Sequence, residues 1–353
     1  MIKRGYVLFM TMAMLALATT IVTQLFFTGS LYNAYAKAQL QREQAKRLAL
    51  SGVACAFSQL SLQDQRFATD EKEDKKNDKQ KKDKSFYKKQ LFKLLLNVQY
   101  RWQSFDLTYA YDGIDATIQF CIMPEDGKIA VNSLYNYKTH SFFASFRNQQ
   151  QTKMYVDFIS EKIPFSKIEK KSSDILAGLL KNYKRPLVSI TELLKHKACQ
   201  KFADRLFFIP DYEEEYKAAK EPCFFLADFF TTYHDSCDLN LWTLSPSVKS
   251  ALGLNPFVYF SSADIKEMSE KIDFGMLGVR RDWDTYLKKI YDKSFDALPK
   301  EIIPFLSSKF EPRVFSVLSY AKVGHVGQKL LAILEKDSVK EGEVIKMKKL
   351  YWL

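Results

Sequence analysis

The sequence predicts an α+β protein in which one very long N-terminal helix leads into a strand-rich head that is interrupted by a large all-α insertion. Three observations predict this fold. Residues 5–36 carry no charged side chain. Residues 105–120 and 314–353 show the alternation and the turn residues of antiparallel strands. Residues 141–308 carry helix-capping patterns instead. Strands therefore open and close the head, with helices between them.

The uncharged N-terminal run predicts a membrane span over residues 6–29. A helix needs about 20 apolar residues to cross the hydrocarbon core of a bilayer, and Tyr6 to Phe27 supplies them, with Gln24 as the one awkward polar side chain. A secretory signal peptide is the alternative, because Ala34-Tyr35-Ala36 reads as a small-x-small cleavage site. The apolar core of a signal peptide is about 7–15 residues long, however, and this run is longer.

The helix is predicted to continue beyond the membrane as a stalk over residues 30–62. From Ala45 onward, small and apolar residues recur at intervals of three and four, which draws one stripe along the helix. Small residues in the stripe, namely Ala45, Ala49, Gly52 and Ala56, allow another helix to approach closely. We interpret this stripe as a subunit interface. Packing of the helix on the protein's own head is the alternative, and both interpretations can hold together.

A strongly charged segment follows the stalk. Residues 68–83 consist almost entirely of charged and amide side chains, which bury little apolar surface. A disordered linker is therefore predicted over residues 63–90. Asp and Glu residues interleave with the lysines and cancel most of their positive field, which argues against a polybasic patch for lipid or nucleic acid.

The first part of the head is predicted over residues 91–140. Apolar and polar residues alternate around Tyr111-Asp112-Gly113, which is a hairpin signal. A second turn falls at Asp126-Gly127, and Ile129 and Val131 are expected to begin a new strand after it. Strands over residues 309–353 are expected to complete the head.

The inserted helical domain is predicted over residues 141–308. Ser189 and Glu192 form a capping box ahead of two leucines, and Ser261 with Asp264 is a weaker version. Ser245 followed by Pro246 begins a short helix that ends at Gly253.

The cysteines and histidines leave two further options. One pair among Cys199, Cys223 and Cys237 lies close enough in sequence to form a disulfide in an oxidising compartment, and buried free thiols are the alternative. His196 with Cys199 and His234 with Cys237 would each share a helix face, and together they make a conceivable tetrahedral zinc set. No standard zinc module has this spacing, so we predict no metal site.

Composition and motifs argue against two classes of function. A net charge of +12 admits nucleic acid or anionic lipid as a partner, but the lysines are spread along the chain. The start Leu239-Asn240-x-x-Thr243 resembles that of a helix-hairpin-helix DNA-binding module. Residues 253–256 lack the second glycine of its hairpin, however, and Pro256 removes an amide that should meet phosphate. The motifs G-x-S-x-G, H-E-x-x-H, G-x-G-x-x-G and the P-loop are all missing from the sequence. We predict neither nucleic-acid binding nor an enzyme.

The N-terminus resembles the leader of type IV prepilins, because Lys3-Arg4-Gly5 stands directly before the apolar run. In that family a membrane peptidase cuts after the glycine, and the new N-terminus is methylated. The resemblance implies a leader over residues 1–5, cleavage between Gly5 and Tyr6, and a prepilin peptidase as partner. Most pilins carry glutamate at the fifth mature position, where this chain has Met10. K-type minor pseudopilins of type II secretion systems typically lack that glutamate.

Further motifs narrow the resemblance to the K-type minor pseudopilins. Pro124 to Leu134 resembles their acidic-Gly-Lys turn followed by Asn-x-Leu, and Gln44 to Gly52 resembles their helix segment. Leu239 to Leu254 and Ser189 to Leu194 more loosely resemble two helix starts in their second half. An acidic Asp-Trp-x-Asp motif that these proteins usually carry is missing from Ser172 to Lys184. Calcium, which some members bind, is therefore not expected, and no cofactor is predicted.

The resemblance implies a pilin-like head in the periplasm and a single span in the inner membrane. It implies a minor pseudopilin at the tip of the type II secretion pseudopilus, which initiates or caps assembly together with I- and J-type minor pseudopilins and the major pseudopilin. Met10 and the small-residue stripe are then the expected subunit-interface helix. A minor pilin of a type IV pilus and a membrane-anchored periplasmic binding protein are the alternatives left open.

Overall fold

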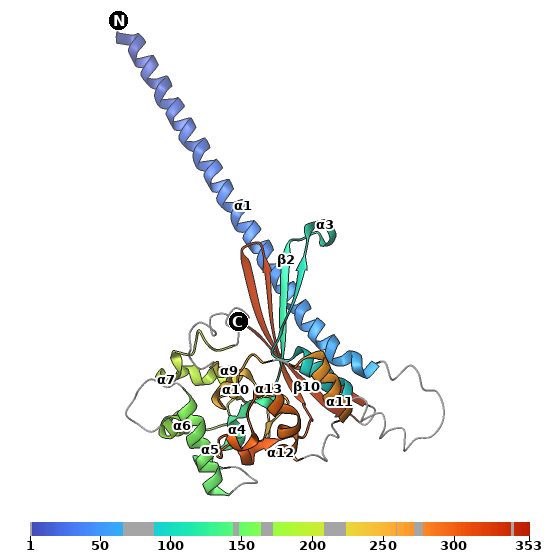
Figure 1. Ribbon diagram of the computed structural model, residues 1–353. Coiled ribbons are helices and arrows are strands. Elements are labelled where there is room, and N and C mark those ends of the chain that lie inside the picture. The colour runs from blue at the N-terminus through green and yellow to red at the C-terminus, as the bar shows by residue number, and fades with distance from the viewer. Residues whose placement is uncertain are drawn as a thin grey trace.

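The computed structural model of the 353-residue chain describes residues 2–65, 88–143, 148–163, 172–207, 224–258, 260–271, 278–339 and 342–353. These residues form one long helix, a five-stranded antiparallel sheet and a set of short helices (Figure 1). The predicted α+β class is therefore confirmed.

Helix α1 (Ile2–Gln65) runs without a break through the predicted span and stalk. Its N-terminal part projects away from the head, and its C-terminal part packs on the sheet (Figure 1). Ala45 is the first fully buried residue of the helix, whereas the large apolar side chains from Tyr6 to Leu40 are exposed. The small side chains of Ala45, Ala49, Gly52 and Ala56 let this part of the helix lie close to the sheet.

The predicted linker was placed too widely at both ends. Residues 63–65 belong to α1, and residues 88–90 belong to a helix over residues 88–98. That helix carries Leu91, Phe92, Leu95 and Leu96, all of them buried, so its apolar face holds it against the head. Residues 66–87 lie outside the described part of the chain.

The sheet joins the two ends of the head in the strand order β1-β2-β9-β10-β11. Its strands are β1 (Trp102–Leu107), β2 (Ala116–Pro124), β9 (Val314–Val323), β10 (Val326–Val339) and β11 (Gly342–Trp352). Strand β2 pairs directly with β9, with Ala116 opposite Val323 and Pro124 opposite Phe315. The insertion therefore leaves the sheet after Pro124 and returns at Val314, which confirms that strands open and close the head.

The two predicted turns of the first part of the head have different outcomes. Gly113 adopts φ 70° after the short helix α3 (Tyr109–Asp112) and links β1 to β2, as expected. After the second turn, however, β3 is only Ile129–Ala130, and α4 (Val131–Leu134) follows at once. The expected longer strand is wrong because β1 and β9 already occupy both edges of β2. Strand β3 pairs instead with β6 (Phe230–Thr231) of the insertion.

The insertion consists mostly of short helices, and the three predicted caps are confirmed. Ser189 forms a full capping box with Glu192, although the helix it starts is a 3₁₀ helix. Ser245 accepts a hydrogen bond from the Val248 amide at 3.2 Å, and Ser261 accepts one from the Asp264 amide at 3.1 Å. The elements are η1 (Glu125–Gly127), α5 (Gln149–Lys162), α6 (Ser172–Lys181), η2 (Ile190–Lys195), α7 (Lys197–Gln200), α9 (Leu226–Phe229), α10 (Pro246–Ala251), α11 (Ser262–Lys271), α12 (Val279–Asp282), a π-turn η3 (Trp283–Leu287), α13 (Lys288–Tyr291), η4 (Phe295–Ala297) and η5 (Ile303–Phe305).

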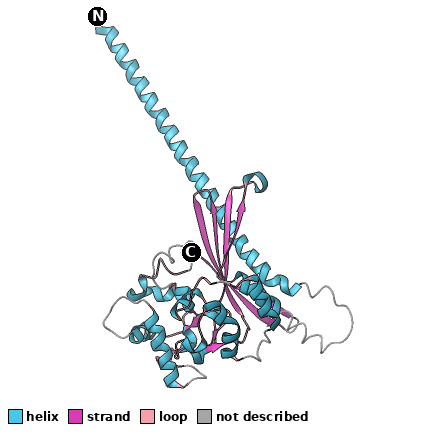
Figure 2. Cartoon of the chain, in the orientation of Figure 1, coloured by secondary structure: helices cyan, strands magenta, loops and turns pink. Residues whose placement is uncertain are grey.

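The insertion is neither all-α nor a separate domain, in contrast to the prediction. Two-residue strands pair within it and with its flanks: β4 (Tyr135–Asn136) with β5 (Ser141–Phe142), and β7 (Leu239–Asn240) with β8 (Leu306–Ser307). One hydrophobic core runs from Ala49 of α1 through Phe315 of the sheet to Trp242 and Trp283 of the insertion. Figure 2 shows the strands between α1 and the cluster of short helices.

Candidate functional site

The N-terminal part of α1 is the segment predicted to anchor the chain in a membrane, and we call it the apolar rod. The described helix is long and apolar enough to cross a membrane. The uncharged stretch, residues 5–36, measures about 48 Å at 1.5 Å per residue, which exceeds a hydrocarbon core of about 30 Å. Its threonine hydroxyls are satisfied within the helix, because Thr11, Thr19, Thr20, Thr23 and Thr28 each donate to a carbonyl three or four residues earlier. Such hydroxyls add little cost in lipid.

Two predicted site residues lie on this rod. Tyr6 and Met10 are both exposed, so the head does not shield either of them from an enzyme or a neighbouring subunit. The structure describes Gly5 only as part of the helix. Cleavage between Gly5 and Tyr6 stays a prediction.

The small-residue stripe lies inside the head, so its assignment as a subunit interface is wrong. Ala45, Ala49 and Ala56 are fully buried. A Cβ atom on Gly52 would lie 2.3 Å from Ser319 Oγ and 3.1 Å from Ile118 Cγ2, so glycine lets α1 approach β2 and β9 closely. The alternative interpretation, packing on the protein's own head, is the one the structure supports. The spacing of small residues identifies a packing face, but it does not say whether a sheet or a second helix covers that face.

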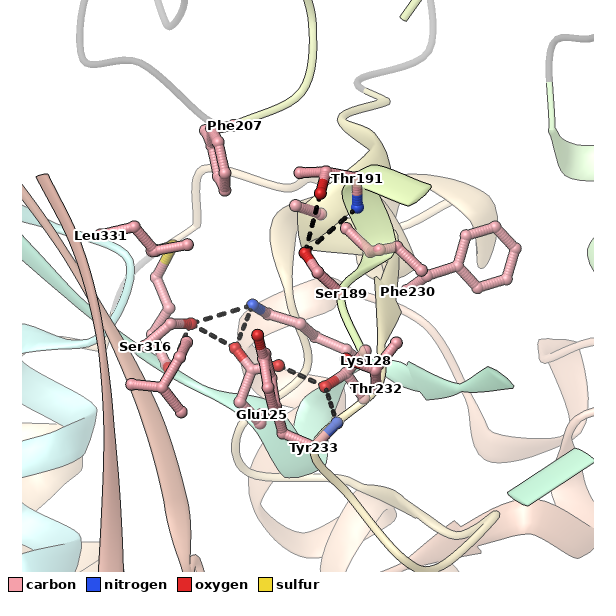
Figure 3. Close-up of a pocket in the computed structure, with 15 residues that line it drawn as sticks. Glu125, Lys128, Ser189, Thr191, Phe207, Phe230, Thr232, Tyr233, Ser316 and Leu331 are labelled. Carbon is pink, nitrogen blue, oxygen red and sulfur yellow. Dashed lines mark hydrogen bonds and ion pairs between the residues drawn. The ribbon is translucent and has the colours of Figure 1, made fainter. Parts of the chain in front are cut away.

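A buried ion pair lies where the insertion leaves the sheet. Glu125 and Lys128 are joined at 2.6 Å between Oε1 and Nζ, and their side chains are 3% and 2% exposed. Glu125 also accepts hydrogen bonds from the hydroxyls of Thr231 and Ser316 (Figure 3). Lys128 donates to Ser316 Oγ at 3.3 Å. A buried charge costs several kcal/mol unless it is paired and hydrogen-bonded, so this arrangement fixes η1 to β6 and β9.

Gly127, between the paired residues, is clamped onto the start of α10. A Cβ atom there would lie 1.7 Å from the Thr243 carbonyl oxygen, and the Gly127 carbonyl accepts from the Ser245 amide at 3.1 Å. The Tyr100 hydroxyl donates to the carbonyls of Pro124 at 2.9 Å and Thr243 at 3.3 Å. The turn after β2 therefore lies directly on the segment before α10, which is far from it in sequence.

The motif segment 189–194 also lies beside the Glu125–Lys128 pair. Ser189 and Thr191 line a small cavity together with Glu125 and Lys128 (Figure 3). Asn132 exchanges two hydrogen bonds with the backbone of Leu187, one with its carbonyl and one with its amide, each 2.9 Å long. The segments 124–134, 189–194 and 239–254 thus converge on one centre, which we call the turn centre. Its charged groups hold segments together, and their burial keeps them from presenting a reactive group to solvent.

Further charged side chains are buried around the turn centre. Burial raises the pKa of Asp126 to about 7, although the Thr243 hydroxyl acts to lower it. Burial also raises the pKa of Asp228, whose Oδ2 accepts from the Ser247 amide at 2.9 Å. Lys249 of α10 lies 5.9 Å from the centroid of the Tyr291 ring, and burial lowers its pKa to about 8. Sequence reasoning missed these residues, since charges in a turn and on a short helix ordinarily face water.

Asp126→Asn is expected to stabilise the chain above pH 7 and to flatten its pH dependence. The folded chain keeps a proton on Asp126 up to about pH 7, whereas the unfolded chain releases it near pH 4. Between these values the folded state binds more protons, so the free energy of unfolding falls as pH rises. The variant should lack this fall, which amounts to a few kcal/mol at most by roughly 1.4 kcal/mol per pKa unit. Urea midpoints of the full chain in detergent at pH 5 and pH 8 measure it. Asp157 of α5, which is only partly buried, is changed to Asn as the control and should keep the wild-type slope. The wild-type slope in Asp126→Asn would contradict the assignment.

The cysteine and zinc options gain no support from the described residues. Cys199 is a free, buried thiol, and the Cys237 thiol donates to the Ser133 carbonyl at 3.0 Å; Cys223 lies outside the described residues. Within the described part of the chain, no three His, Cys, Asp or Glu side chains gather as a metal site would require. His196 and Cys199 are therefore not brought together with His234 and Cys237.

Comparisons with known proteins give a structural similarity but no match to a protein family or a curated protein. Among solved structures, the chain is similar to one in the crystal structure of the GspK-GspI-GspJ complex from the enterotoxigenic Escherichia coli type 2 secretion system. The similarity covers 90% of this chain and 99% of that chain, with a TM-score of 0.45 and 12% sequence identity. Similarity at this level does not establish a function, so the function is argued from the residues and their geometry.

Proposed function

We propose that this chain is a K-type minor pseudopilin of a type II secretion system, anchored in the inner membrane with its head in the periplasm. One observation carries the proposal: an uncharged, exposed helix stands directly behind Lys3-Arg4-Gly5 and runs unbroken into the head. The apolar core of a secretory signal peptide is about 7–15 residues long, whereas this uncharged stretch is longer and forms one helix with the packed stalk. Such a helix serves first as a membrane anchor and then as the shaft by which subunits associate.

The placement of the insertion supports a position at the tip. The short helices gather at the end of the head away from the N-terminus (Figure 1). In a filament whose subunits stack with their N-terminal helices parallel, the next subunit toward the tip would meet this insertion. A subunit with nothing above it has no such conflict. The chain would therefore initiate or cap the pseudopilus rather than repeat along it.

Met10 supports the same position. By resemblance, the glutamate of an ordinary pilin at this place neutralises the terminal amine of a neighbouring subunit. An unpaired charge in hydrocarbon costs several kcal/mol, so a subunit with Met10 offers no partner for another subunit's amine. Its own amine can still pair with a neighbour's glutamate. Only the first subunit of a filament pairs its own amine with a neighbour's glutamate while no other subunit's amine needs a partner from it.

The proposed role is assembly rather than catalysis. Its partners would be the I- and J-type minor pseudopilins, the major pseudopilin and the prepilin peptidase. This role requires a rigid head. The buried ion pair Glu125–Lys128 contributes to that rigidity, because it joins the insertion to the sheet at Ser316. A minor pilin of a type IV pilus shares the leader and the shaft, but an insertion between β2 and β9 is not a feature of an ordinary pilin head.

Gly5→Val is expected to abolish maturation, because a β-branched side chain does not fit a peptidase site that accepts glycine. The test expresses the full chain with its prepilin peptidase and measures the intact mass and the N-terminal sequence. The wild type should begin at Tyr6 with a methylated amine, and the variant should keep residues 1–5. Gly29→Val is the matched control, since Gly29 has open space around it, and it should be cleaved normally. A mature chain that begins at Lys37 would identify a secretory signal peptide and overturn the proposal.

A further inference from the structure

The edge strand β11 leaves large apolar side chains exposed on one face of the sheet. Met347, Leu350 and Trp352 are 50%, 39% and 46% exposed. Their partners across β10 are Leu334, Ala332 and Leu330, which belong to the core that also contains Ala49 and Ala56 of α1. Since cross-strand partners share a face, these three side chains lie on the face of the sheet that α1 covers.

The opposite face of β11 is occupied, so the orientation of the strand is fixed. Tyr351 packs with Leu331 and Ile333 in a second core. Lys349 donates to the Val188 carbonyl at 3.1 Å and lies 5.1 Å from the centroid of the Tyr233 ring. A one-residue slip in register would expose these groups and bury the others. The exposure of the apolar side chains is thus a property of the fold.

Helix α1 contacts β11 but leaves these three side chains partly exposed. Its side toward β1 and β2 is marked by Gln59, which is hydrogen-bonded to Gln103 at 2.7 Å, and by Leu48, which packs with Ala116. Leu50 lies on the other flank, two residues or about 200° further round the helix than Leu48, and it is 39% exposed. We call Leu50, Met347, Leu350 and Trp352 the β11 strip.

The spacing leaves room for one more helix. Strands lie about 4.8 Å apart, and packed helices lie 8–10 Å apart. Helix α1 packs mainly on β9 and β10, less on β2 and less again on β11. A second helix packed 8–10 Å beside it would therefore lie over β11, which α1 covers only in part.

The strip opens toward the side from which α1 leaves the head. Trp352 lies opposite Leu330, near the start of β10. The turn that leads into β10 lies against α1 at Gln41, since a Cβ on Gly324 would be 2.7 Å from Gln41 Nε2. Beyond Gln41, α1 continues as the exposed apolar rod. The β11 strip therefore lies toward the side of the head from which α1 leaves, so a helix that comes from the same membrane can reach it alongside α1.

We propose that the β11 strip receives the N-terminal helix of a second membrane-anchored pilin-like subunit, which lies parallel to α1. This rests on the proposed function and names the surface by which the chain holds an I- or J-type minor pseudopilin. An apolar shaft suits the strip because Trp and Met are well suited to the centre of a protein interface. The interface thus moves from the buried small-residue stripe to the flank of the same helix.

Site-specific photocrosslinking tests the proposal. Benzoylphenylalanine replaces Met347 or Trp352 in the full chain, which is expressed in membranes with tagged I- and J-type minor pseudopilins of the same organism. Adducts with one of these partners are expected at both positions, and peptide mapping should place them on the partner's N-terminal helix. The control position is Tyr111, which is 92% exposed on α3 and should give no adduct. Adducts only within this chain, or none while the complex still co-purifies, would overturn the β11 strip and leave the proposed function standing. Failure of the wild type to form any complex would overturn both.

Charge substitutions give an independent measure. Met347→Lys and Leu50→Lys should each weaken co-purification roughly tenfold or more, because each places a charge in a dry contact. Both side chains are partly exposed, so the melting temperature of the variant chains should stay close to that of the wild type. Tyr111→Lys is the matched control and should bind normally. Undiminished binding of both variants would contradict the proposal.

Discussion

Gly127→Ala is expected to destabilise the head more than alanine at any other glycine whose surroundings the structure describes. The new Cβ would lie 1.7 Å from the carbonyl oxygen of Thr243, and that neighbour is backbone, which cannot rotate away. Relief requires η1 to separate from the start of α10, which breaks the Ser245–Gly127 hydrogen bond and strains the Glu125–Lys128 pair. A cost of about 3 kcal/mol or more is expected, with a fall in melting temperature of roughly 5–10 °C.

The measurement uses the full chain in detergent. Near-UV circular dichroism follows the packing of the tryptophans, because Trp242 and Trp283 are fully buried in the insertion. Gly178→Ala is the matched control: Gly178 lies in α6 with nothing within 4 Å of the added carbon, so alanine should be neutral or slightly stabilising there. If Gly127→Ala melts like the wild type, the turn centre does not hold the insertion to the sheet.

Ala49→Trp is the second large effect, and it decides the role of the stalk stripe. Ala49 is fully buried against the sheet, so a tryptophan there forces α1 off the sheet at a cost of at least about 3 kcal/mol. The expected result is loss of the near-UV signal and rapid proteolysis of the head, while the N-terminal rod still inserts into membranes. Limited proteolysis of membrane-inserted full chain measures it.

Ala54→Trp provides the comparison on the same helix. Ala54 is exposed, one turn from the buried stripe, and the same side chain there should leave the head folded and protease-resistant. A folded Ala49→Trp variant that fails to bind its partners would restore the subunit-interface interpretation of the stripe. An unfolded Ala49→Trp variant beside a folded Ala54→Trp variant agrees with burial in the head.

Local patterns in the sequence predicted the elements that local chemistry controls. The caps at Ser189, Ser245 and Ser261 occur where their side chains match the helix-start pattern, and Gly113 takes the left-handed conformation that a turn needs. Strand β9 coincides with the run of β-forming residues Val314–Val323. Each of these depends on contacts within a few residues, which a sequence displays directly.

The candidate site was predictable only in part. The turn at Asp126-Gly127 was recognised, but the burial of Glu125 and Lys128 was not, because an acidic-Gly-Lys turn on its own ordinarily faces water. Ser316 and Thr231 satisfy the ion pair from 188 and 106 residues away from Lys128 and Glu125, respectively. No spacing rule connects residues so far apart, and only the return of the chain at β9 brings them together.

The sequence by itself indicated that an uncharged apolar helix follows Lys3-Arg4-Gly5 and that strands enclose a helical insertion. Charge, periodicity and capping act locally, so they survive in the sequence as readable patterns. The tertiary structure decided which surface the stalk stripe covers and which apolar side chains stay exposed. Ala49 and Met347 are both apolar residues at regular spacing, and one is buried while the other is half exposed. The difference arises because α1 lies mainly over β9 and β10 and has fewer contacts with the edge strand β11, where Met347 stays partly exposed.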